Sequence, residues 1–325
     1  MDLLAYEKKY WQKGLVNIVG IDEAGRGPLA GPVVAACVVL HKNLTIKGVN
    51  DSKKLSPKKR NELFDIIIEN AADVSVGIVN EQDIDKLNIL QATFLAMKRA
   101  VGNLKVIPDQ LLVDGPYSNI KMFSVETIIK GDSKSASVAS ASIIAKVTRD
   151  RIMEEYHKIY PEYNFIKHKG YGTKFHIEQL LKYKASPIHR KSFKIVKSNL
   201  PSFKFYEENN GLYDLGKKLV ATSFIKKNYN LYDKDIFLKN IGDSIDYIYA
   251  NKNETNYIKV IVEYNSILYP LAIEGKVNIK SYIKNLRDLT NEKEVTKKTS
   301  FIVILVKFIT KKKPLIKVLN NENIY

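Results

Sequence analysis

A short apolar run that ends in two adjacent carboxylates constrains the fold of this chain more than any other stretch. Residues 18–21 have the composition of a buried strand, and Asp22 and Glu23 follow where that strand should end. Neighbouring strand side chains point to opposite faces, so the two carboxylates cannot both face the core. A divalent cation would offset the penalty of burying one of them, because hard cations take oxygen ligands. A polar strand end that leads into a plain loop is the alternative.

The loop after the two carboxylates favours a ligand site over that alternative. Glycines and prolines crowd residues 24–32, so the backbone must turn tightly and can come close to a ligand. Arg26 stands between Gly25 and Gly27. A guanidinium held between two flexible glycines suits an anion, and exposed amides in such a loop suit a phosphate or a sugar hydroxyl.

Two later stretches place further acids at the ends of predicted elements. Asp114 ends the apolar run of residues 111–113, and Asp132 precedes a long helix predicted over residues 136–158. Asp150 on that helix is a competing acid, although arginines flank it. Converging carboxylates would repel one another unless cations neutralised them, so the pattern predicts two divalent ions. Ligation by carboxylates alone favours Mg²⁺ or Mn²⁺ over zinc.

Basic side chains and one tyrosine accompany these acids. Lys53 and Lys54 precede a helix predicted from residue 57, and they read either as phosphate contacts or as solvated surface lysines. Tyr171 lies between two glycines in a basic loop. Its ring could stack on a sugar or a base, or it could simply be packed in a turn.

The charge balance points to a polyanionic partner. The chain has 325 residues, enough for two domains, and a formal net charge of +17. Residues 1–210 hold 32 basic and 23 acidic side chains, and residues 211–325 hold 20 and 12, so both halves are basic. This excess favours nucleic acid as the partner, although a lysine-rich genome composition would explain part of it.

Cysteine usage and hydropathy predict the compartment. Cys37 is the single cysteine and cannot form an internal disulfide. The charged N-terminus lacks the apolar core of a signal peptide, and no apolar stretch approaches the roughly 18 residues of a membrane-spanning helix. We therefore expect a soluble cytoplasmic protein with no membrane partner, and we take it to be a monomer.

Several motifs, taken in order, resemble those of bacterial ribonuclease HII. The resemblance covers residues 16–197. It rests on these segments: Gly-Ile-Asp-Glu-Ala-Gly-Arg-Gly-Pro at 20–28, Asn-Asp-Ser-Lys-Lys-Leu at 50–55, Val-Asp-Gly at 113–115, Gly-Asp-Ser-Lys-Ser at 131–135, Ala-Ser-Ile-Ile-Ala-Lys-Val-Thr-Arg-Asp at 141–150, Lys-Gly-Tyr-Gly-Thr at 169–173 and residues 186–193.

The resemblance implies a ribonuclease H fold, an α/β architecture in which helices flank a central mixed sheet and the acids lie at strand ends. It implies endonucleolytic cleavage of the RNA strand of RNA–DNA hybrids, and cleavage 5′ of single ribonucleotides embedded in duplex DNA. The expected products carry 3′-hydroxyl and 5′-phosphate ends. The expected role is ribonucleotide removal in DNA replication and repair.

The resemblance also implies roles for individual residues. Four would be metal-binding catalytic acids that hold two Mn²⁺ or Mg²⁺ ions: Asp22, Glu23, Asp114 and Asp132. Three would sense the ribose 2′-hydroxyl, the group that distinguishes RNA from DNA: Gly25, Arg26 and Gly27. Tyr171 would stack on the sugar that follows. Four more would contact phosphates: Lys53, Lys54, Ser133 and Lys134.

Two alternatives remain open for this part of the chain. One is a catalytically silent nucleic-acid-binding protein, and the retained acids argue against it because a silent binder gains nothing from negative charge beside phosphates. The other is an exonuclease or resolvase of the wider ribonuclease H superfamily. The loop of residues 25–27 and Tyr171 argue against it, since an enzyme that acts on DNA alone has no use for a 2′-hydroxyl sensor.

We expect residues 1–198 to form the catalytic domain, residues 199–210 a linker, and residues 211–325 a small α/β domain. Helices are predicted there over residues 212–227 and 277–289. This second domain resembles restriction-endonuclease-like nucleases whose core reads Gly-Glu-Ile-Asp and then Val-Glu-Val-Lys.

The second domain departs from that pattern at several positions. Asp246 and Glu263 match the core, but Ser244 stands in place of its glutamate and Asn265 in place of its lysine. Lys217 occupies a site that is usually acidic. We therefore expect this domain to cleave nothing and to bind nucleic acid or another protein.

Overall fold

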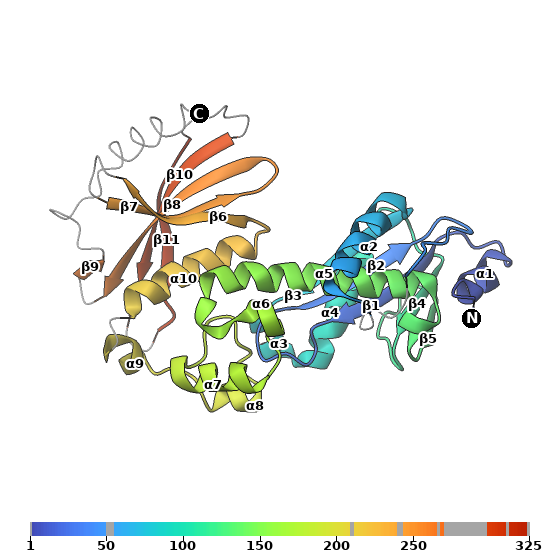
Figure 1. The fold of residues 1–325 in the computed structure, drawn as a ribbon, viewed down its shortest axis with the longest axis horizontal. Helices are drawn as coiled ribbons and strands as arrows, with labels where there is room; N and C mark the ends of the chain where they lie inside the picture. Colours follow the sequence, from blue (N-terminus) through green and yellow to red (C-terminus); the bar gives the residue numbers. More distant parts are fainter. Residues whose placement is uncertain are drawn as a thin grey trace. The chain divides into compact units, whose positions relative to one another are not determined.

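Two compact units make up the computed structural model of this chain. The first comprises Met1–Glu154 and Phe165–Asn199, and the second comprises Glu155–Asn164 and Leu200–Tyr325. The structure describes residues 2–49, 55–208, 211–238, 243–264, 267–269, 298–309 and 312–323. Each unit has its own sheet (Figure 1).

A five-stranded mixed sheet forms the centre of the first unit. Its strands are β1 (Ile18–Ala24), β2 (Val33–Val39), β3 (Asp73–Val79), β4 (Gln110–Asp114) and β5 (Val125–Ile128). In the order β3-β2-β1-β4-β5, β2 is antiparallel to both of its neighbours, whereas β1, β4 and β5 run parallel to one another. The apolar run that ends in two carboxylates is therefore the middle strand.

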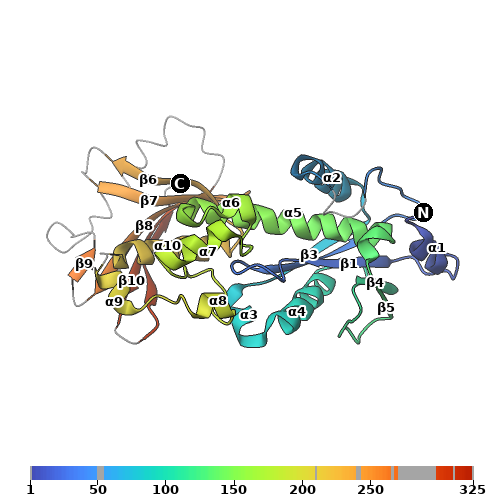
Figure 2. The ribbon, with the colours of Figure 1, turned by 60° about the horizontal axis from the view of Figure 1, so that its bottom comes forward.

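Helices cover both faces of this sheet. The helices of this unit are α1 (Ala5–Trp11), α2 (Pro57–Asn70), α3 (Glu81–Leu87), α4 (Ile89–Gly102), α5 (Ala136–Ile159), α6 (Phe165–His168), α7 (Lys174–Tyr183) and α8 (Lys194–Lys197), with a 3₁₀ turn η1 (Gly131–Ser133). Figure 2 shows α2 and α5 on one face and α4 on the other, and each face has its own apolar core. β2 is buried along its whole length because both of its faces are covered. This confirms the predicted α/β architecture.

The start of α5 lies directly against β1. A Cβ atom on Gly20 would come within 2.0 Å of the Ser137 carbonyl carbon, so only glycine fits at this point of the strand. The helix begins Ala-Ser-Val-Ala-Ser-Ala-Ser, and these small side chains permit the approach. The N-terminal end of α5 therefore lies beside the strand that carries Asp22.

A buried carboxylate from the N-terminal helix anchors the beginning of α5. Glu7 of α1 is fully buried, and its Oε1 accepts hydrogen bonds from the hydroxyls of Ser135 (2.6 Å) and Ser137 (2.7 Å) and from the Ser137 N–H (2.9 Å). A helix N-terminus carries unpaired N–H groups and partial positive charge, so a carboxylate is favourable there. α1 thus holds α5 in place against the sheet.

The second unit contains a six-stranded sheet. Its strands are β6 (Asn230–Leu238), β7 (Asp243–Ala250), β8 (Glu254–Tyr264), β9 (Ile267–Tyr269), β10 (Lys298–Lys307) and β11 (Leu315–Asn323). The order is β11-β10-β8-β7-β6 with β9 beside β8, and only the β8–β10 pair among these is parallel. α10 (Leu212–Ile225) packs on β8, and a second 3₁₀ turn, η2 (Pro161–Tyr163), belongs to this unit.

Two expectations for this half need comment. The stretch predicted as a linker contains a helix, α9 (Phe203–Glu208), because Phe203 packs its ring on Tyr264 of β8 with the ring centres 5.1 Å apart. The helix predicted over residues 277–289 lies outside the described residues.

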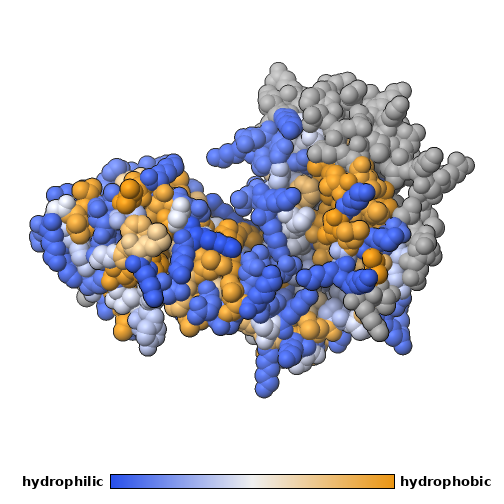
Figure 3. All heavy atoms as spheres, turned by 180° about the vertical axis from the view of Figure 1, so that it is seen from behind, coloured by the Kyte–Doolittle hydropathy of each residue, from blue (hydrophilic) through white to orange (hydrophobic). Residues whose placement is uncertain are grey.

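Figure 3 shows hydrophilic side chains on one face of the described residues, with sizeable apolar patches between them. No helix in the described part of the chain is both long and apolar enough to cross a bilayer.

Glu7→Gln should destabilise the first unit. The amide keeps the volume but loses the negative charge at the start of α5, and we expect the free energy of unfolding to fall by about 2 kcal/mol. Urea denaturation followed by the fluorescence of Trp11, the single tryptophan, measures it. Glu62→Gln is the control, because Glu62 is exposed and its pair with Lys59 should contribute little. Equal stabilities for the two variants would contradict the prediction.

Candidate active site

The ends of two parallel strands bring Asp22 and Asp114 side by side. Ile21 of β1 pairs with Val113 of β4, and each acid follows its paired residue by one position. Asp22 is only 5% exposed, and Asp114 is partly buried. Two of the predicted acids therefore lie together at the carboxyl edge of the sheet.

The electrostatic surroundings of Asp22 are unfavourable to its ionised form. Burial raises the pKa of Asp22 well above its usual value of 3.8, and the negative charges of Glu23 and Asp114 raise it further. A hydrogen bond from Ser142 of α5 and one from the Glu23 N–H (2.7 Å) oppose this shift in part. The charges of Glu23 and Asp114 thus add to the cost of ionising buried Asp22.

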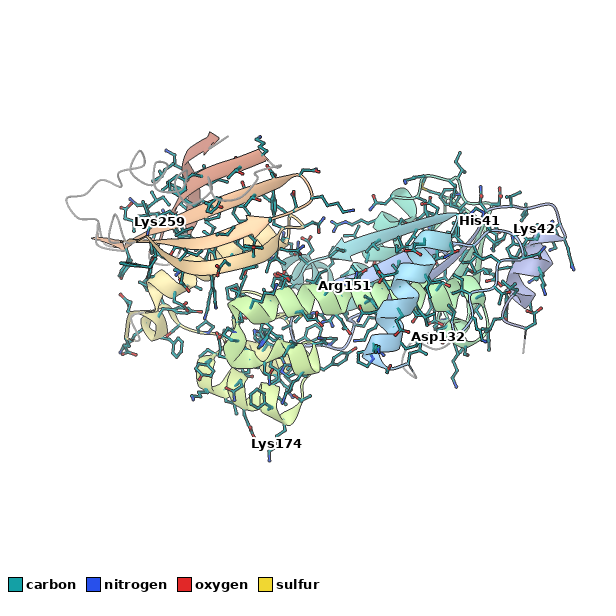
Figure 4. The ribbon with its side chains drawn as sticks, turned by 45° about the horizontal axis from the view of Figure 1, so that its top comes forward. His41, Lys42, Asp132, Arg151, Lys174 and Lys259 are labelled. Atoms are coloured by element: carbon teal, nitrogen blue, oxygen red, sulfur yellow. The ribbon has the colours of Figure 1, made fainter. Side chains whose placement is uncertain are left out.

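Asp132 directly follows Gly131, whose backbone contacts Asp114. The Gly131 N–H donates a hydrogen bond of 2.6 Å to the Asp114 carboxylate, and Asp132 follows it in η1. Asp132 is 5% exposed. Figure 4 labels it near the N-terminal end of α5, on the side of the first unit away from Lys174. Asp150, the competing acid, is held by Lys146 one turn earlier on α5, with 2.6 Å between the charged atoms.

The donor set fits a hard divalent cation. All the acids offer carboxylate oxygens, and a cation would relieve the repulsion that raises the pKa of Asp22. Across the described ranges, no three His, Cys, Asp or Glu side chains are gathered closely enough to hold an ion as they stand. Carboxylates repel one another without a cation, so ligation would require these side chains to turn toward it.

The other residues expected at the site are distributed around these acids. Arg26 reaches back to Glu23, with 3.3 Å between a guanidinium nitrogen and a carboxylate oxygen. Ser133 donates its hydroxyl hydrogen to the Lys130 carbonyl (2.9 Å). Lys134 follows it and is partly exposed. Lys53 and Lys54 lie outside the described residues.

Two buried arginines lie beneath the loop of residues 25–32. Arg149 of α5 donates to three carbonyl oxygens at 2.9–3.1 Å, those of Ala30, Pro32 and Lys169. Arg190 donates to other carbonyls of the same loop. Burial lowers the pKa of Arg149 to about 10 and that of Arg190 to about 9, so both guanidinium groups stay protonated at neutral pH.

Tyr171 lies next to the same loop. A Cβ atom on Gly27 would come 3.5 Å from a carbon of the Tyr171 ring, and the tyrosine is 45% exposed. The structure therefore brings the Gly-Arg-Gly segment and the predicted stacking ring together from positions far apart in the sequence.

A chain of buried histidines holds the backbone of Tyr171. The Ser186 N–H donates to His189 Nδ1 (3.0 Å), so a neutral His189 carries its proton on Nε2 and donates it to His176 Nε2 (3.0 Å). His176 then carries its proton on Nδ1 and donates it to the Tyr171 carbonyl (2.9 Å). Burial lowers the pKa of both histidines, to about 4 for His176. Both stay neutral, and the direction of every hydrogen bond is fixed.

The sequence did not single out these buried arginines and histidines. Arg149 and Arg190 stand in charged runs, where exposed side chains are the usual expectation. The sequence contains one indication of a role for the two arginines: both lie inside motifs that resemble those of the family, at residues 141–150 and 186–193.

The two acids matched in the second unit do not lie together. Asp246 of β7 accepts a hydrogen bond from the Val260 N–H of β8 (2.7 Å), and Glu263 lies three residues, or about 10 Å, further along that strand. Asp246 is fully buried and is paired with the ammonium of Lys217 at 3.1 Å. Glu263 is paired with Lys307 at 2.6 Å. Lysines already balance both charges.

Asp22→Asn should stabilise the first unit in metal-free buffer. Folding raises the pKa of Asp22, so the ionised carboxylate destabilises the protein above that acid's ordinary pKa, and an amide carries no such charge. We expect a gain of about 1 kcal/mol at pH 7, or roughly 2–4 °C in Tm, followed by Trp11 fluorescence.

A matched control, the same substitution at Asp109, should change the Tm in the opposite direction. Asp109 accepts hydrogen bonds from the Val16 and Asn17 N–H groups, which lower the pKa of Asp109, so Asp109→Asn should lower the Tm. Mn²⁺ should raise the Tm of the unaltered chain more than that of Asp22→Asn. A lower Tm for Asp22→Asn without metal would refute the electrostatic account.

Stability of the first unit should fall as the pH drops from 6.5 toward 4. Above pH 6.5, His176 is neutral in both the folded and the unfolded protein. Between pH 6.5 and about 4, His176 binds a proton in the unfolded protein but not in the folded one, so unfolding becomes more favourable. This effect of His176 alone should lower the free energy of unfolding by about 3 kcal/mol at pH 4. Urea midpoints followed by Trp11 fluorescence measure this. His176→Gln should remove this part of the dependence and leave the part that comes from His189, whereas His41→Gln, at an exposed site, should leave the whole dependence unchanged.

Comparison with known proteins assigns residues 19–196 to one family. The family model described as Ribonuclease HII matches residues 19–196. A ribonuclease HII from Clostridioides difficile (strain 630) is 58% identical over 188 residues, which are 58% of this chain and 74% of that protein. One from Endomicrobium trichonymphae is 56% identical over 199 residues, 60% of this chain and 93% of that protein.

A solved structure is also similar to this chain in fold. The crystal structure of ribonuclease H2 from Pyrococcus horikoshii OT3 is 30% identical, with a TM-score of 0.50, and the match covers 56% of this chain and 96% of that one. The family match occupies more than half of this chain and includes Asp22, Asp114 and Asp132. The chain therefore belongs to the ribonuclease HII family, and it is an endoribonuclease that acts on RNA–DNA hybrids.

Proposed function

We propose that this enzyme hydrolyses phosphodiesters with two divalent cations, Mn²⁺ or Mg²⁺, and that it cuts 5′ of single ribonucleotides in duplex DNA as well as within hybrids. The observation that carries this proposal is the parallel pairing of β1 with β4, which brings buried Asp22 beside Asp114; the raised pKa of Asp22 is consistent with it. Asp132 would complete the set of ligands. This concentration of negative charge destabilises the fold, and bound cations would remove that cost.

Different residues at the sheet edge would bind the cations and contact the phosphates of the substrate. Bound there, the cations would supply an activated water and stabilise the leaving 3′ oxygen, which gives 3′-hydroxyl and 5′-phosphate products. Four residues would hold them: Asp22, Glu23, Asp114 and Asp132. Ser133, Lys134 and the pair Lys53 and Lys54 would contact phosphates and fix the register of the duplex.

The loop of residues 25–27 and Tyr171 would recognise the ribose. The proximity of Gly27 to the Tyr171 ring supports this, because one nucleotide could meet both. The loop would meet the 2′-hydroxyl, and the half-exposed ring would stack on the next sugar. Such a site suits ribonucleotide removal during DNA replication and repair.

The second unit would not be a nuclease. Lys217 already neutralises Asp246, and Glu263 lies too far along β8 to share a cation with it. Residues 211–325 carry 20 basic and 12 acidic side chains, which favours nucleic acid as the partner of this unit.

A duplex with one embedded ribonucleotide tests the proposal. It is compared with an all-DNA duplex of the same sequence and with an RNA–DNA hybrid, each with and without Mn²⁺ or Mg²⁺. We expect metal-dependent cleavage 5′ of the ribonucleotide and within the hybrid, and none of the all-DNA duplex.

Two variants assign the activity to its residues. Asp114→Asn should lower the rate more than about 100-fold, because a metal ligand matters at least as much as its supporting contacts. Asp65→Asn, the same change at an exposed position of α2, should leave the rate unchanged. Full activity of Asp114→Asn would remove it from the site, and nicking of all-DNA duplex by that variant would make the second unit a nuclease.

A further inference from the structure

Arg190 makes four hydrogen bonds to the loop that would meet the ribose. The side chain is fully buried. Its guanidinium donates to four carbonyl oxygens, those of Gly25 (2.5 Å), Arg26 (2.9 Å), Gly31 (3.0 Å) and Pro32 (3.2 Å). The rigid planar fork of a guanidinium allows this, whereas a lysine ammonium is a point charge with three donors.

These hydrogen bonds orient two peptide planes. In a trans peptide the C=O and the following N–H point in opposite directions. The carbonyls of Gly25 and Arg26 point inward to Arg190, so the N–H groups of Arg26 and Gly27 point outward. Gly25 is buried, whereas Arg26 and Gly27 are exposed, in agreement with this orientation.

Glycine at position 25 is required for this arrangement. Its φ of +99° lies in the region that side chains rarely adopt, and a Cβ atom there would come 2.2 Å from Arg149 Nε. The outward N–H groups stand on a segment that contacts Glu23 through Arg26 and Tyr171 through Gly27. They therefore lie close to both the acids and the stacking ring.

We propose that Arg190 sets the discrimination between ribose and deoxyribose by aiming the Arg26 and Gly27 N–H groups at the 2′-hydroxyl. This inference rests on the proposed function, because it takes this loop as the site that meets the ribose. Arg190 touches no substrate and is a positioning residue. A sugar without the hydroxyl leaves the two donors without a partner, so discrimination depends on how firmly the loop holds them.

Binding to paired duplexes tests the proposal. The full chain carries Asp114→Asn to prevent cleavage, and fluorescence anisotropy gives the Kd for a duplex with one ribonucleotide and for its all-DNA counterpart. The protein with intact Arg190 should prefer the ribonucleotide duplex. Arg190→Lys should lower this preference about tenfold and leave the Kd for all-DNA unchanged. A merely structural role would weaken binding of both duplexes equally.

Arg149→Lys is the matched control. Arg149 is also a buried guanidinium beneath this loop, but its carbonyl partners are Ala30, Pro32 and Lys169 rather than Gly25 or Arg26. Arg149→Lys should lose comparable thermal stability, and it should lose less of the preference for ribose than Arg190→Lys does. Equal loss of preference in both variants, or full preference in Arg190→Lys, would overturn the assignment. Absence of any preference with Arg190 intact would instead refute the proposed recognition of ribose by this loop.

A second measurement covers the case in which Arg190→Lys does not fold. In the Asp114→Asn chain, NMR measures the exchange of the Arg26 and Gly27 N–H hydrogens with water. Outward-facing groups should exchange rapidly in the free protein and become protected by the ribonucleotide duplex alone. Protection in the free protein, or equal protection by the all-DNA duplex, would contradict the inferred orientation.

Discussion

The unfavourable proximity of Asp22 to the charges of Glu23 and Asp114 is the constraint on which the first unit depends. Parallel pairing of β1 with β4 forces the two aspartates together, and burial makes the ionised form of Asp22 less favourable still. The rest of the fold must be stable enough to tolerate this. The covered sheet and the close contact of α5 with Gly20 supply that stability.

Around these acids, buried polar side chains hold backbone segments, in two cases together with neighbouring buried side chains. Glu7 binds the start of α5, Arg190 binds the carbonyls of the glycine loop, and His176 binds the carbonyl of Tyr171. Each of these side chains is buried and is hydrogen-bonded to the segment that it holds. The segments that carry the predicted site residues are thereby held from beneath, while Arg26 and Tyr171 remain exposed to a substrate.

Each unit has a buried aspartate, and the two aspartates have different neighbours. Asp22 has carboxylates as neighbours, whereas Asp246 has the ammonium of Lys217 within 3.1 Å and a backbone N–H at 2.7 Å. The first arrangement would favour a bound cation, as we propose, whereas in the second the ammonium of Lys217 supplies the positive charge. The same residue type in the same buried setting therefore points to chemistry in one unit and to structure in the other.

The sequence by itself determined the apolar strand that carries Asp22 and the small-residue helix α5, because periodicity and motif order are local properties. It placed the end of that strand too early, since β1 continues through Glu23 to Ala24. It missed the helix α9 and the roles of Arg149, Arg190, His176 and His189. Whether a charged side chain is exposed or buried beneath a loop depends on which distant segments fold over it. Only the tertiary structure decided that Gly27 meets Tyr171, that Arg190 turns the loop carbonyls inward, and that Glu263 lies away from Asp246.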